Sequence, residues 1–385
     1  MNFVLFYHSL VSDWNHGNAH FLRGVVTELL AKGHTVTTYE PADSWSKANL
    51  VKDHGEQPLK EFSQHYPNLS SIQYDKNSLD LTQATDNADV VIVHEWNEDW
   101  LVNGLGKVRK ANPAFRLLFH DTHHRAISDP NGIKAFELEY YDGILAFGEV
   151  LSEVYRQHGW HNQVWTWHEA ADTNVFYPHQ PSDDIVKGDV VWVGNWGDNE
   201  RTQTLQEFLF QPTQELKLTT NIFGVRYPPE VLTKLKAWEI KYHGWLANFR
   251  APDVFANHRM TVHIPRKFYT EQLPGIPTIR PFEAMACGIP LICAPWEDAE
   301  NLFTPGEDYL VVKNGDQMQK AMQALLNDDD YAAEMAQHAL NTILSGHTCA
   351  HRADQLLKIC NSMDVKPRSL STPRDSQLLT QETYL

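Results

Sequence analysis

Residues 280–290 read Arg-Pro-Phe-Glu-Ala-Met-Ala-Cys-Gly-Ile-Pro, and Leu-Ile-Cys-Ala-Pro follows at 291–295. This stretch decides the fold, because its small alanines and glycine let a helix pack closely on a buried strand that begins at Leu291, as in a parallel α/β sheet. The free N–H groups at the start of such a helix can bind a diphosphate. A carboxylate there would repel that phosphate, so we expect Glu283, at the helix start, to bond hydroxyl groups such as those of a ribose.

The composition limits the possible functions. The chain has 385 residues, enough for two domains, and 42% of them are apolar, enough for full cores. Its formal net charge of −17 at pH 7 disfavours nucleic-acid binding and docking to anionic lipid. The four cysteines show no Cys-x-x-Cys spacing, which favours a reduced, cytoplasmic protein without disulfides. We expect neither a signal peptide nor a transmembrane segment.

Apolar runs typical of strands alternate with helical patterns along the whole chain, which predicts parallel sheets covered on both faces. The pattern restarts after a joint at 178–187 that is rich in proline and acids. We therefore predict two doubly wound domains, residues 1–180 and 181–363, that face a cleft, and a disordered tail at 364–385. The expected strands are 3–7, 35–39, 90–94, 117–120 and 143–147, and then 189–193, 216–223, 241–243, 260–264, 291–294 and 309–312.

Several motifs together resemble a known family. They are the stretch at 280–288, Phe-Thr-Pro-Gly-Glu-Asp at 303–308, Gly-His-Thr-Cys-Ala-His-Arg at 346–352, and, in the first half, Lys-Gly-His-Thr-Val at 32–36 and the segment 170–178. The chain resembles the GT-B glycosyltransferases, and its second half is similar to the "glycosyl transferases group 1" domain of CgeB-like proteins. The resemblance implies two Rossmann-like domains facing a cleft. It also implies transfer of a sugar from a nucleoside-diphosphate sugar to the hydroxyl group of a carbohydrate or small-molecule acceptor.

The resemblance further implies a retaining reaction that needs no metal and no cofactor besides the nucleotide-sugar co-substrate. Glu283 would bind the ribose, and basic side chains would stabilise the leaving diphosphate. Retaining members carry a second glutamate where this chain has Gly275, so backbone N–H groups of that loop could contact the sugar instead. The expected donor-binding residues are Glu283, Arg201, Arg266, Lys267, Arg280, Gly244, Gly275 and Ala284. The alternatives are a glutamate that stabilises a helix dipole, surface arginines and an ordinary turn at Gly244.

A polar cluster, His-Asp-Thr-His-His at 120–124, follows a predicted strand of the first domain. The resemblance places His120 near the transferred sugar, and Asp121 would be the acid–base residue of an inverting enzyme. A metal site and a polar helix cap are the alternatives. The loop with Gly17 and Asn18 is expected to approach the acceptor and the diphosphate. Trp14 and Trp96 could stack on sugars, although core packing is the alternative for any single tryptophan.

The sequence thus predicts a cytoplasmic GT-B glycosyltransferase that binds no nucleic acid. Two other functions fit the same fold. One is an inactive GT-B protein that binds a sugar or nucleotide, which Gly275 favours, and the other is a nucleotide-sugar epimerase, which needs no acceptor. A Rossmann dehydrogenase is disfavoured, because no Gly-x-Gly-x-x-Gly follows any predicted strand.

Overall fold

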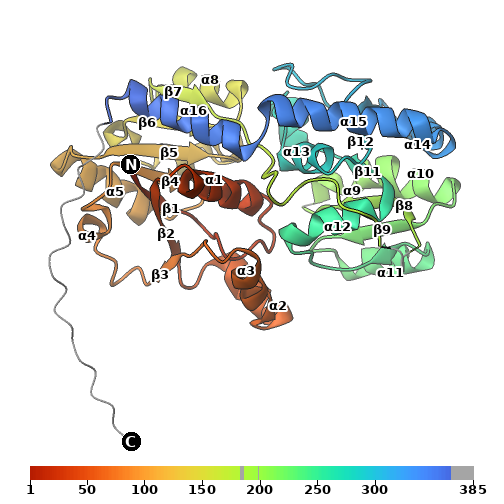
Figure 1. The fold of residues 1–385 in the computed structure, drawn as a ribbon, viewed down its shortest axis with the longest axis horizontal. Helices are drawn as coiled ribbons and strands as arrows, with labels where there is room; N and C mark the ends of the chain where they lie inside the picture. The colour runs from red at the N-terminus through yellow and green to blue at the C-terminus, as the bar shows by residue number, and fades with distance from the viewer. Residues whose placement is uncertain (183–185, 198, 366–385) are drawn as a thin grey trace, which may run out of the picture.

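The structure is a computed structural model that describes residues 1–182, 186–197 and 199–365. Two parallel sheets lie side by side, each covered by helices on both faces (Figure 1). This arrangement confirms the predicted fold class. Most of the expected tail lies outside the described residues, as does part of the joint at 178–187. Among the helices that are described, none is long and apolar enough to cross a membrane.

The first sheet has seven parallel strands in the order β3-β2-β1-β4-β5-β6-β7. Its central strand β1 is apolar, and Phe3 lies opposite Val36 on one side and Val90 on the other. Such strands are buried on both faces, which explains their continuous apolar runs. The bounds are β1 Asn2–Phe6, β2 Thr35–Pro41, β3 Ile72–Tyr74, β4 Val90–His94, β5 Arg116–Asp121, β6 Gly143–Ala146 and β7 Val164–Thr166.

The second sheet has six strands, also parallel, in the order β10-β9-β8-β11-β12-β13. The two sheets fall on either side of the predicted boundary at residues 180/181, which itself stays a prediction. The bounds are β8 Gly188–Val193, β9 Thr220–Phe223, β10 Lys241–Tyr242, β11 His258–His263, β12 Leu291–Cys293 and β13 Leu310–Val311.

The helices of the first sheet follow its strands in alternation. Those before the second sheet are α1 Ala19–Ala31, α2 Trp45–His54, α3 Gln57–His65, α4 Leu81–Thr85, α5 Asp99–Ala111, α6 Arg125–Ser128, α7 Pro130–Lys134, η1 Leu138–Tyr140 and α8 Glu149–Gln157. Those after β8 are η2 Asn199–Arg201, α9 Thr202–Leu205, η3 Gln206–Phe210, α10 Gln211–Glu215, α11 Pro229–Ala237, η4 Asn248–Arg250, α12 Ala251–Ala256, η5 Phe268–Gln272, α13 Ile279–Ala286, α14 Gly315–Asn327, α15 Asp329–Gly346 and α16 Cys349–Ser362.

Helix α13 corrects one expectation about the stretch at 280–290. The helix begins at Ile279, so Glu283 lies in its middle and not at its start. Pro281 is tolerated there because it falls in the first turn, where backbone N–H groups have no partner within the helix. Glu283 therefore sits among side chains that pack on the sheet, away from the free N–H groups at the start of α13.

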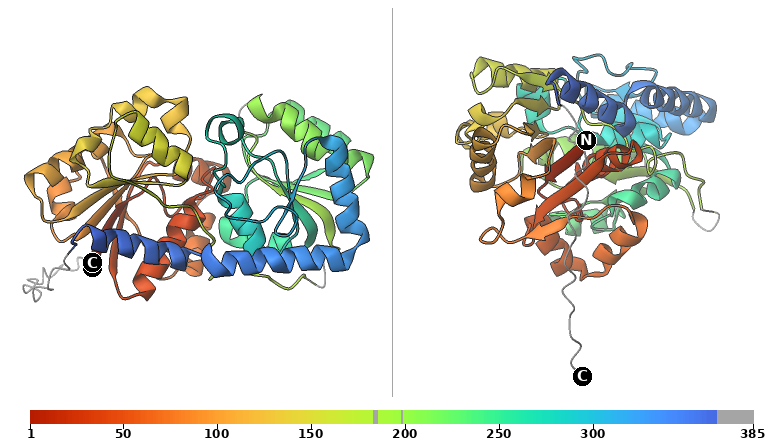
Figure 2. Two further views of the ribbon diagram at one scale, coloured as in Figure 1. Left: turned by 90° about the horizontal axis from the view of Figure 1, so that it is seen from above. Right: turned by 60° about the vertical axis from the view of Figure 1, so that its left-hand side comes forward.

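The last helix, α16, returns to the first domain and packs against α1. Figure 2 shows α15 lying along the second domain and α16, in darker blue, along the first. Thr348 caps α16 by accepting a hydrogen bond from the backbone N–H of His351. The buried Arg352 donates a hydrogen bond to the backbone oxygen of His168 at 2.9 Å. The motif at 346–352 therefore anchors the chain's last helix.

A glycine on α1 makes the close contact with α16 possible. A Cβ atom at Gly24 would lie 2.5 Å from the sulfur of Cys349 and 2.7 Å from the Cβ of Asp172. In a free helix, Gly to Ala stabilises by about 1 kcal/mol. Here we expect Gly24→Ala to lower the free energy of unfolding by about 1–3 kcal/mol, because the added methyl overpacks the interface.

Urea denaturation of the purified protein would measure this change. Gly346→Ala is the control, because Gly346 is also helical, as the last residue of α15, and a Cβ there would meet nothing within 4 Å. We expect the control to be neutral or stabilising. A Gly24→Ala variant as stable as this control would contradict the packing described for α1 and α16.

Candidate active site in the cleft between the domains

A cleft of about 1040 Å³ separates the two domains. Its lining comes from residues at or after the ends of β1 to β5 in the first sheet and of β8, β9 and β11 in the second. These are the carboxyl ends of parallel strands, where open α/β sheets bind their ligands. The cleft is therefore the candidate active site.

The loop between β1 and α1 forms one side of the cleft and contacts the second domain. Gly17 and Asn18 line the cleft, as predicted for this loop. Asp13 pairs with Arg23 at 2.9 Å and accepts hydrogen bonds at 3.0 Å from the indole of Trp245 and from the backbone N–H of Asn248. One buried carboxylate thus fixes the loop and ties it to the second domain.

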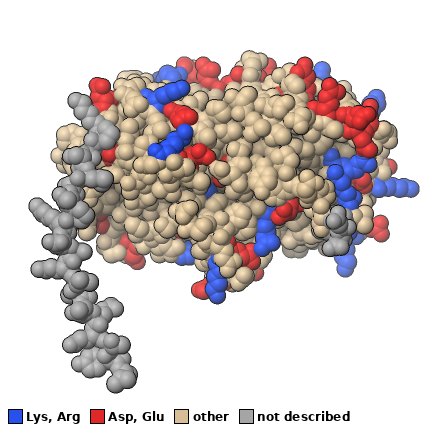
Figure 3. Space-filling view, viewed as in Figure 1, with Lys and Arg blue, Asp and Glu red and all other residues tan. Residues whose placement is uncertain are grey.

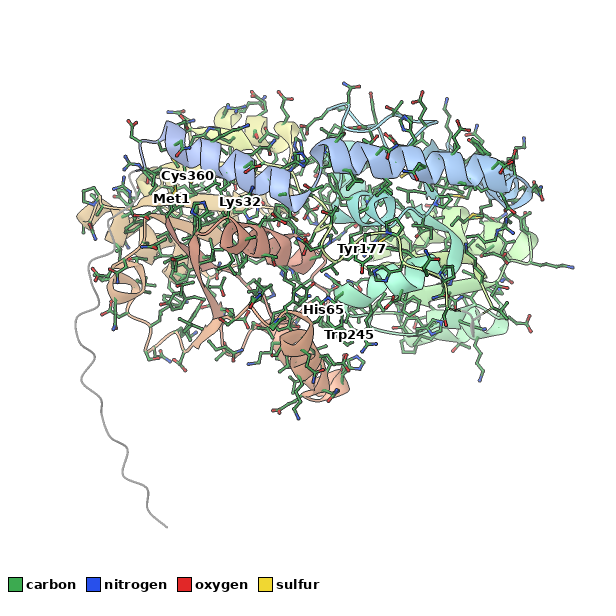
Figure 4. All side chains as sticks on the ribbon, in the orientation of Figure 1. Met1, Lys32, His65, Tyr177, Trp245 and Cys360 are labelled. Carbon is green, nitrogen blue, oxygen red and sulfur yellow. The ribbon has the colours of Figure 1, made fainter. Side chains whose placement is uncertain are left out.

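Other contacts join the domains around this loop. The Asn195 amide donates to the Asn15 side chain at 2.7 Å, and the ring of His65 stacks on Phe249 with centroids 4.4 Å apart. Figure 4 shows His65 of α3 and Trp245 of the second domain near one another at this junction. The structure therefore represents a state in which the two domains are in contact across the cleft.

Three arginines line the second-domain wall of the cleft in the described part of the chain: Arg201, Arg226 and Arg266. Arg201 donates to the backbone oxygens of Asn195 and Ile264, and burial lowers its pKa to about 10, so it stays charged at neutral pH. Arg266 bonds the Glu200 carboxylate at 2.5 Å. This basic wall belongs to a protein whose formal net charge is −17. It is suited to bind an anion such as a diphosphate.

The structure places the two predicted catalytic residues beneath the cleft and not in it. His120 has no exposed surface and packs against Trp167, with ring centroids 4.8 Å apart. Burial lowers its pKa to about 3, so it is neutral at physiological pH. Asp121, also fully buried, accepts hydrogen bonds from the Tyr155 hydroxyl at 2.7 Å and the backbone N–H of His123 at 3.0 Å.

Two histidines of the same predicted cluster do reach the cleft. His123 and His124 line it, and the ring of His124 stacks on Phe268 with centroids 3.9 Å apart. The reason is the length of β5. The strand continues through Asp121, which pairs with Ala146, so both expected catalytic side chains fall inside the sheet layer.

The buried Asp121 makes the stability of the folded protein depend on pH. Burial raises its pKa from 3.8 to about 6, so the folded protein binds this proton more tightly than the unfolded chain does. The contribution of Asp121 to the free energy of unfolding is therefore largest at low pH and decreases as the pH rises from about 4 to about 6. We expect Asp121→Asn, which cannot ionise, to gain stability relative to the wild type over that window and to hold the gain at pH 7.

Urea denaturation of both proteins between pH 4 and pH 8 would measure the difference. Glu334→Gln on the exposed face of α15 is the control, for which we expect a difference that does not vary in this way with pH. If the free energies of unfolding of the wild type and of Asp121→Asn differ by the same amount at every pH, Asp121 does not bind its proton more tightly in the folded protein.

The buried side chain of Glu283 contacts one residue from each domain. His20 of α1 lies 2.8 Å from its carboxylate, and Arg280 forms an ion pair with it. The other ring nitrogen of His20, Nε2, accepts the backbone N–H of Asp172 at 2.8 Å. The hydrogen of the neutral ring is therefore on Nδ1, and His20 donates it to Glu283. Since Glu283 is 1% exposed, its contact with a ribose stays a prediction.

A small cavity of about 50 Å³ lies beside this group and is lined by Arg280 of α13, Gly224 and Trp245. A water molecule occupies about 30 Å³ in the liquid, so this cavity is too small for a nucleoside. A nucleotide in this place would require the domains to move apart.

The remaining predicted residues lie outside the large cleft. Trp14 is 6% exposed and lies against Trp45, which does line the cleft. Gly275 has φ +88° and packs against the backbone of Ala299. Ala284 is part of the core, Lys267 is exposed outside the lining, and Gly244, with φ +76°, accepts a hydrogen bond from the N–H of Gly224 at 2.7 Å.

Sequence reasoning missed part of the lining. Arg226 lies three residues after the end of β9 and just after Gly224. A cation so close to the end of a predicted strand could have been recognised from the sequence as a candidate for the cleft lining. Arg125, Trp45 and Trp100 line the cleft as well, but their spacing in the sequence gives no such signal. No group of three or more His, Cys, Asp or Glu side chains is arranged to hold a metal ion within residues 1–182, 186–197 and 199–365.

Comparisons with known proteins agree with this architecture. Residues 201–358 match the family model described as glycosyl transferase-like. The structure is similar to sucrose-phosphate synthase from Thermosynechococcus elongatus, with a TM-score of 0.63 at 12% identity over 94% of this chain and 99% of that one. It is also similar to Anabaena HepE in complex with UDP-glucose, with a TM-score of 0.67 at 13% identity over 94% and 100%.

A third similar structure is an α-glucosyltransferase in complex with UDP and DNA, with a TM-score of 0.67 at 13% identity over 94% and 99% of the two chains. No curated protein matches the sequence significantly. These similarities show that the two-domain fold is the GT-B fold. Residues 201–358 are similar to the glycosyl transferase-like family. The narrower CgeB-like resemblance stays a prediction.

Proposed function

We propose that the protein transfers a glycosyl group from a UDP-sugar to an acceptor hydroxyl, with retention of configuration and without a metal ion. The observation that supports this proposal most strongly is the wall formed by Arg201, Arg226 and Arg266 in the interdomain cleft of an otherwise acidic protein. The choice of uridine is supported by similar structures that hold UDP or UDP-glucose. Glu283, Arg280 and the other predicted donor residues of the second domain belong to this proposal.

The arginine wall suits the departure of a diphosphate. When the bond from the anomeric carbon to the diphosphate breaks, negative charge grows on the leaving oxygen. Guanidinium groups held in place before the reaction stabilise that charge with little reorganisation. Arg201 is held by two backbone oxygens and Arg266 by a carboxylate, so both are positioned before a ligand binds. These side chains would take the role that a metal ion has in other transferases.

The position of Asp121 removes one candidate base for an inverting reaction. An inverting transferase needs a base that reaches the acceptor hydroxyl. Asp121 was the predicted base, but it is fully buried and already accepts two hydrogen bonds. In a retaining reaction, the leaving diphosphate itself can take the acceptor proton on the same face of the sugar, so no such protein base is required.

Domain movement would admit the donor. The cavity beside Arg280 holds only about 50 Å³, and contacts such as that between Asp13 and Trp245 join the domains around it. Opening would let a nucleotide enter, and closure would exclude water and align the acceptor with the anomeric carbon.

Thermal denaturation with a panel of nucleoside diphosphates and their sugars tests the donor. UDP at 100 times its dissociation constant should stabilise the protein by about 2.7 kcal/mol. The same panel with EDTA tests metal independence, and product analysis by NMR tests retention. Binding without turnover would favour an inactive sugar-binding protein, and conversion of the sugar without an acceptor would favour an epimerase. No shift with any nucleotide would overturn the proposal.

A further inference from the structure

The first-domain wall of the cleft is built from aromatic side chains. Four of them line the cleft in the described part of the chain: Trp45, Tyr74, Trp96 and Trp100. They lie at or after the carboxyl ends of β2, β3 and β4, so they share one side of the cleft opposite the arginines: Trp45 begins α2, Tyr74 ends β3, Trp96 lies between β4 and α5, and Trp100 belongs to α5. No leucine, isoleucine, valine, methionine or alanine is found among the described residues that line the cleft.

Two of these indoles are exposed although they are large and apolar. Trp45 is 49% exposed and Trp96 is 43% exposed, whereas most tryptophans of the chain are buried or half-buried. Each is supported from behind. Trp14 packs edge-on against Trp45 at 5.0 Å, and His123 and Arg125 pack against Trp96 at 4.8 Å and 5.3 Å. A supported, exposed indole is a flat surface that is ready to receive a ring.

Carboxylates are interspersed with these aromatic rings. Asp43, Glu98 and Asp129 line the cleft, and all three belong to the first domain. Glu98 accepts the indole N–H of Trp100 at 2.7 Å, which orients that ring. Asp43 and Asp129 are exposed. The first-domain wall also carries Lys76 and Arg125, and Arg125 lies 3.6 Å from Asp129. This wall therefore has charges of both signs, whereas the described charged residues that line the second-domain wall are the three arginines, so the two walls suit different ligands.

We propose that this aromatic wall, Trp45, Tyr74, Trp96 and Trp100, is the acceptor subsite and that the acceptor is a saccharide of at least two rings. This inference rests on the proposed transferase function. Pyranose rings present apolar C–H faces to indoles, and their hydroxyls donate hydrogen bonds to carboxylates. A lipid chain would favour aliphatic side chains, which the described lining does not contain. A flat aromatic aglycone also stacks on indoles, so the test includes such compounds.

The volume of the cleft, about 1040 Å³, is at the upper end of the range of about 300–1000 Å³ that is usual for ligand pockets. The different side chains of the two walls assign the nucleotide-sugar to the arginine wall and the acceptor to the aromatic wall. The anomeric carbon would lie between the two walls, near Gly17 and Asn18, which also line the cleft.

The test uses saturation-transfer NMR on the full chain with UDP present. The probes are neutral di- and trisaccharides (maltose, cellobiose, xylobiose and maltotriose) and the phenolic aglycones quercetin and umbelliferone. We expect at least one saccharide to bind and the aglycones not to bind. Trp45→Leu and Trp96→Leu keep apolar volume but remove the flat face, and each should weaken saccharide binding about tenfold. The dissociation constant for UDP should stay unchanged.

Tyr177→Ala is the matched control, because Tyr177 is 48% exposed but lies on the segment between the domains, outside the cleft (Figure 4). We expect it to bind saccharides like the wild type. Aglycone binding in preference to saccharides, no saccharide binding while UDP still binds, or undiminished binding by both tryptophan variants would each overturn the inference. A different outcome would separate the two proposals. If the wild-type protein binds saccharides but not UDP, and the tryptophan variants lose saccharide binding, the acceptor subsite is supported and the donor proposal is overturned.

Discussion

Replacing Arg266 with alanine is expected to lower kcat/KM for the UDP-sugar by about 10²- to 10³-fold, the usual effect of removing one positioned donor to a developing negative charge. Arg266 lines the cleft at the end of β11 and is held by Glu200 at 2.5 Å. Its loss removes one cation from the diphosphate side and leaves the Glu200 carboxylate without that partner. Initial-rate measurements with a saturating acceptor would give the change.

Arg259→Ala is the control for this variant. Arg259 lies in β11, the strand that precedes Arg266, but its side chain bonds Asp329 and the backbone oxygen of Leu326, outside the cleft. We expect the control to keep kcat/KM within about threefold of the wild type. Equal effects of the two substitutions, or an Arg266→Ala variant with full activity, would show that the arginine wall does not contact the leaving group.

Removing the carboxylate of Glu283 is expected to have the largest effect on stability. Glu283→Ala leaves Arg280 and the Nδ1–H of His20 without their acceptor in a site that is almost fully buried. Breaking a buried ion pair by removing one partner costs about 3–5 kcal/mol. We expect a loss of that size in the free energy of unfolding, measured by urea denaturation. Glu283→Gln keeps an acceptor for His20 and should lose less.

Glu334→Ala, on the exposed face of α15, should change the free energy of unfolding by less than about 0.5 kcal/mol. A Glu283→Ala variant as stable as this control would contradict the buried contact with His20 and Arg280. The folded Glu283→Gln variant separates stability from binding. If Glu283 also binds the ribose, this variant will lose more affinity for UDP than for 2′,3′-dideoxy-UDP, which lacks the hydroxyls. Equal losses would exclude that role.

Much of the fold could be predicted because its signals are local. The buried runs that became β1, β4, β11 and β12 are continuous in the sequence, and the small residues between 284 and 288 mark a helix that packs on a sheet. The arginines at 201 and 266 were found because each follows a strand of the second sheet closely. Figure 3 shows charged side chains of both signs on the face it draws, so the basic wall is not apparent on this face.

The surroundings of single residues could not be predicted, because they depend on contacts between distant parts of the chain. Glu283 meets His20, which lies 263 positions earlier in the sequence and belongs to the other domain. His120 and Asp121 are buried because β5 extends to Asp121, a boundary that only the pairing with β6 sets. The aromatic wall is likewise assembled from residues at or after the ends of three different strands.

The return of α16 to the first domain has a consequence for how the two halves can move. The chain crosses between the domains twice, and the two crossings are bonded to each other where Ala171 donates to His347 at 3.0 Å and accepts from Cys349 at 2.8 Å. Because the domains are joined by two chain segments that are hydrogen-bonded to each other, we expect them to rotate about one axis and not to move freely relative to each other. Opening of the cleft should therefore follow a single rotational path, and a protein cut near residue 180 would lose the hinge along with the helix that completes its first half.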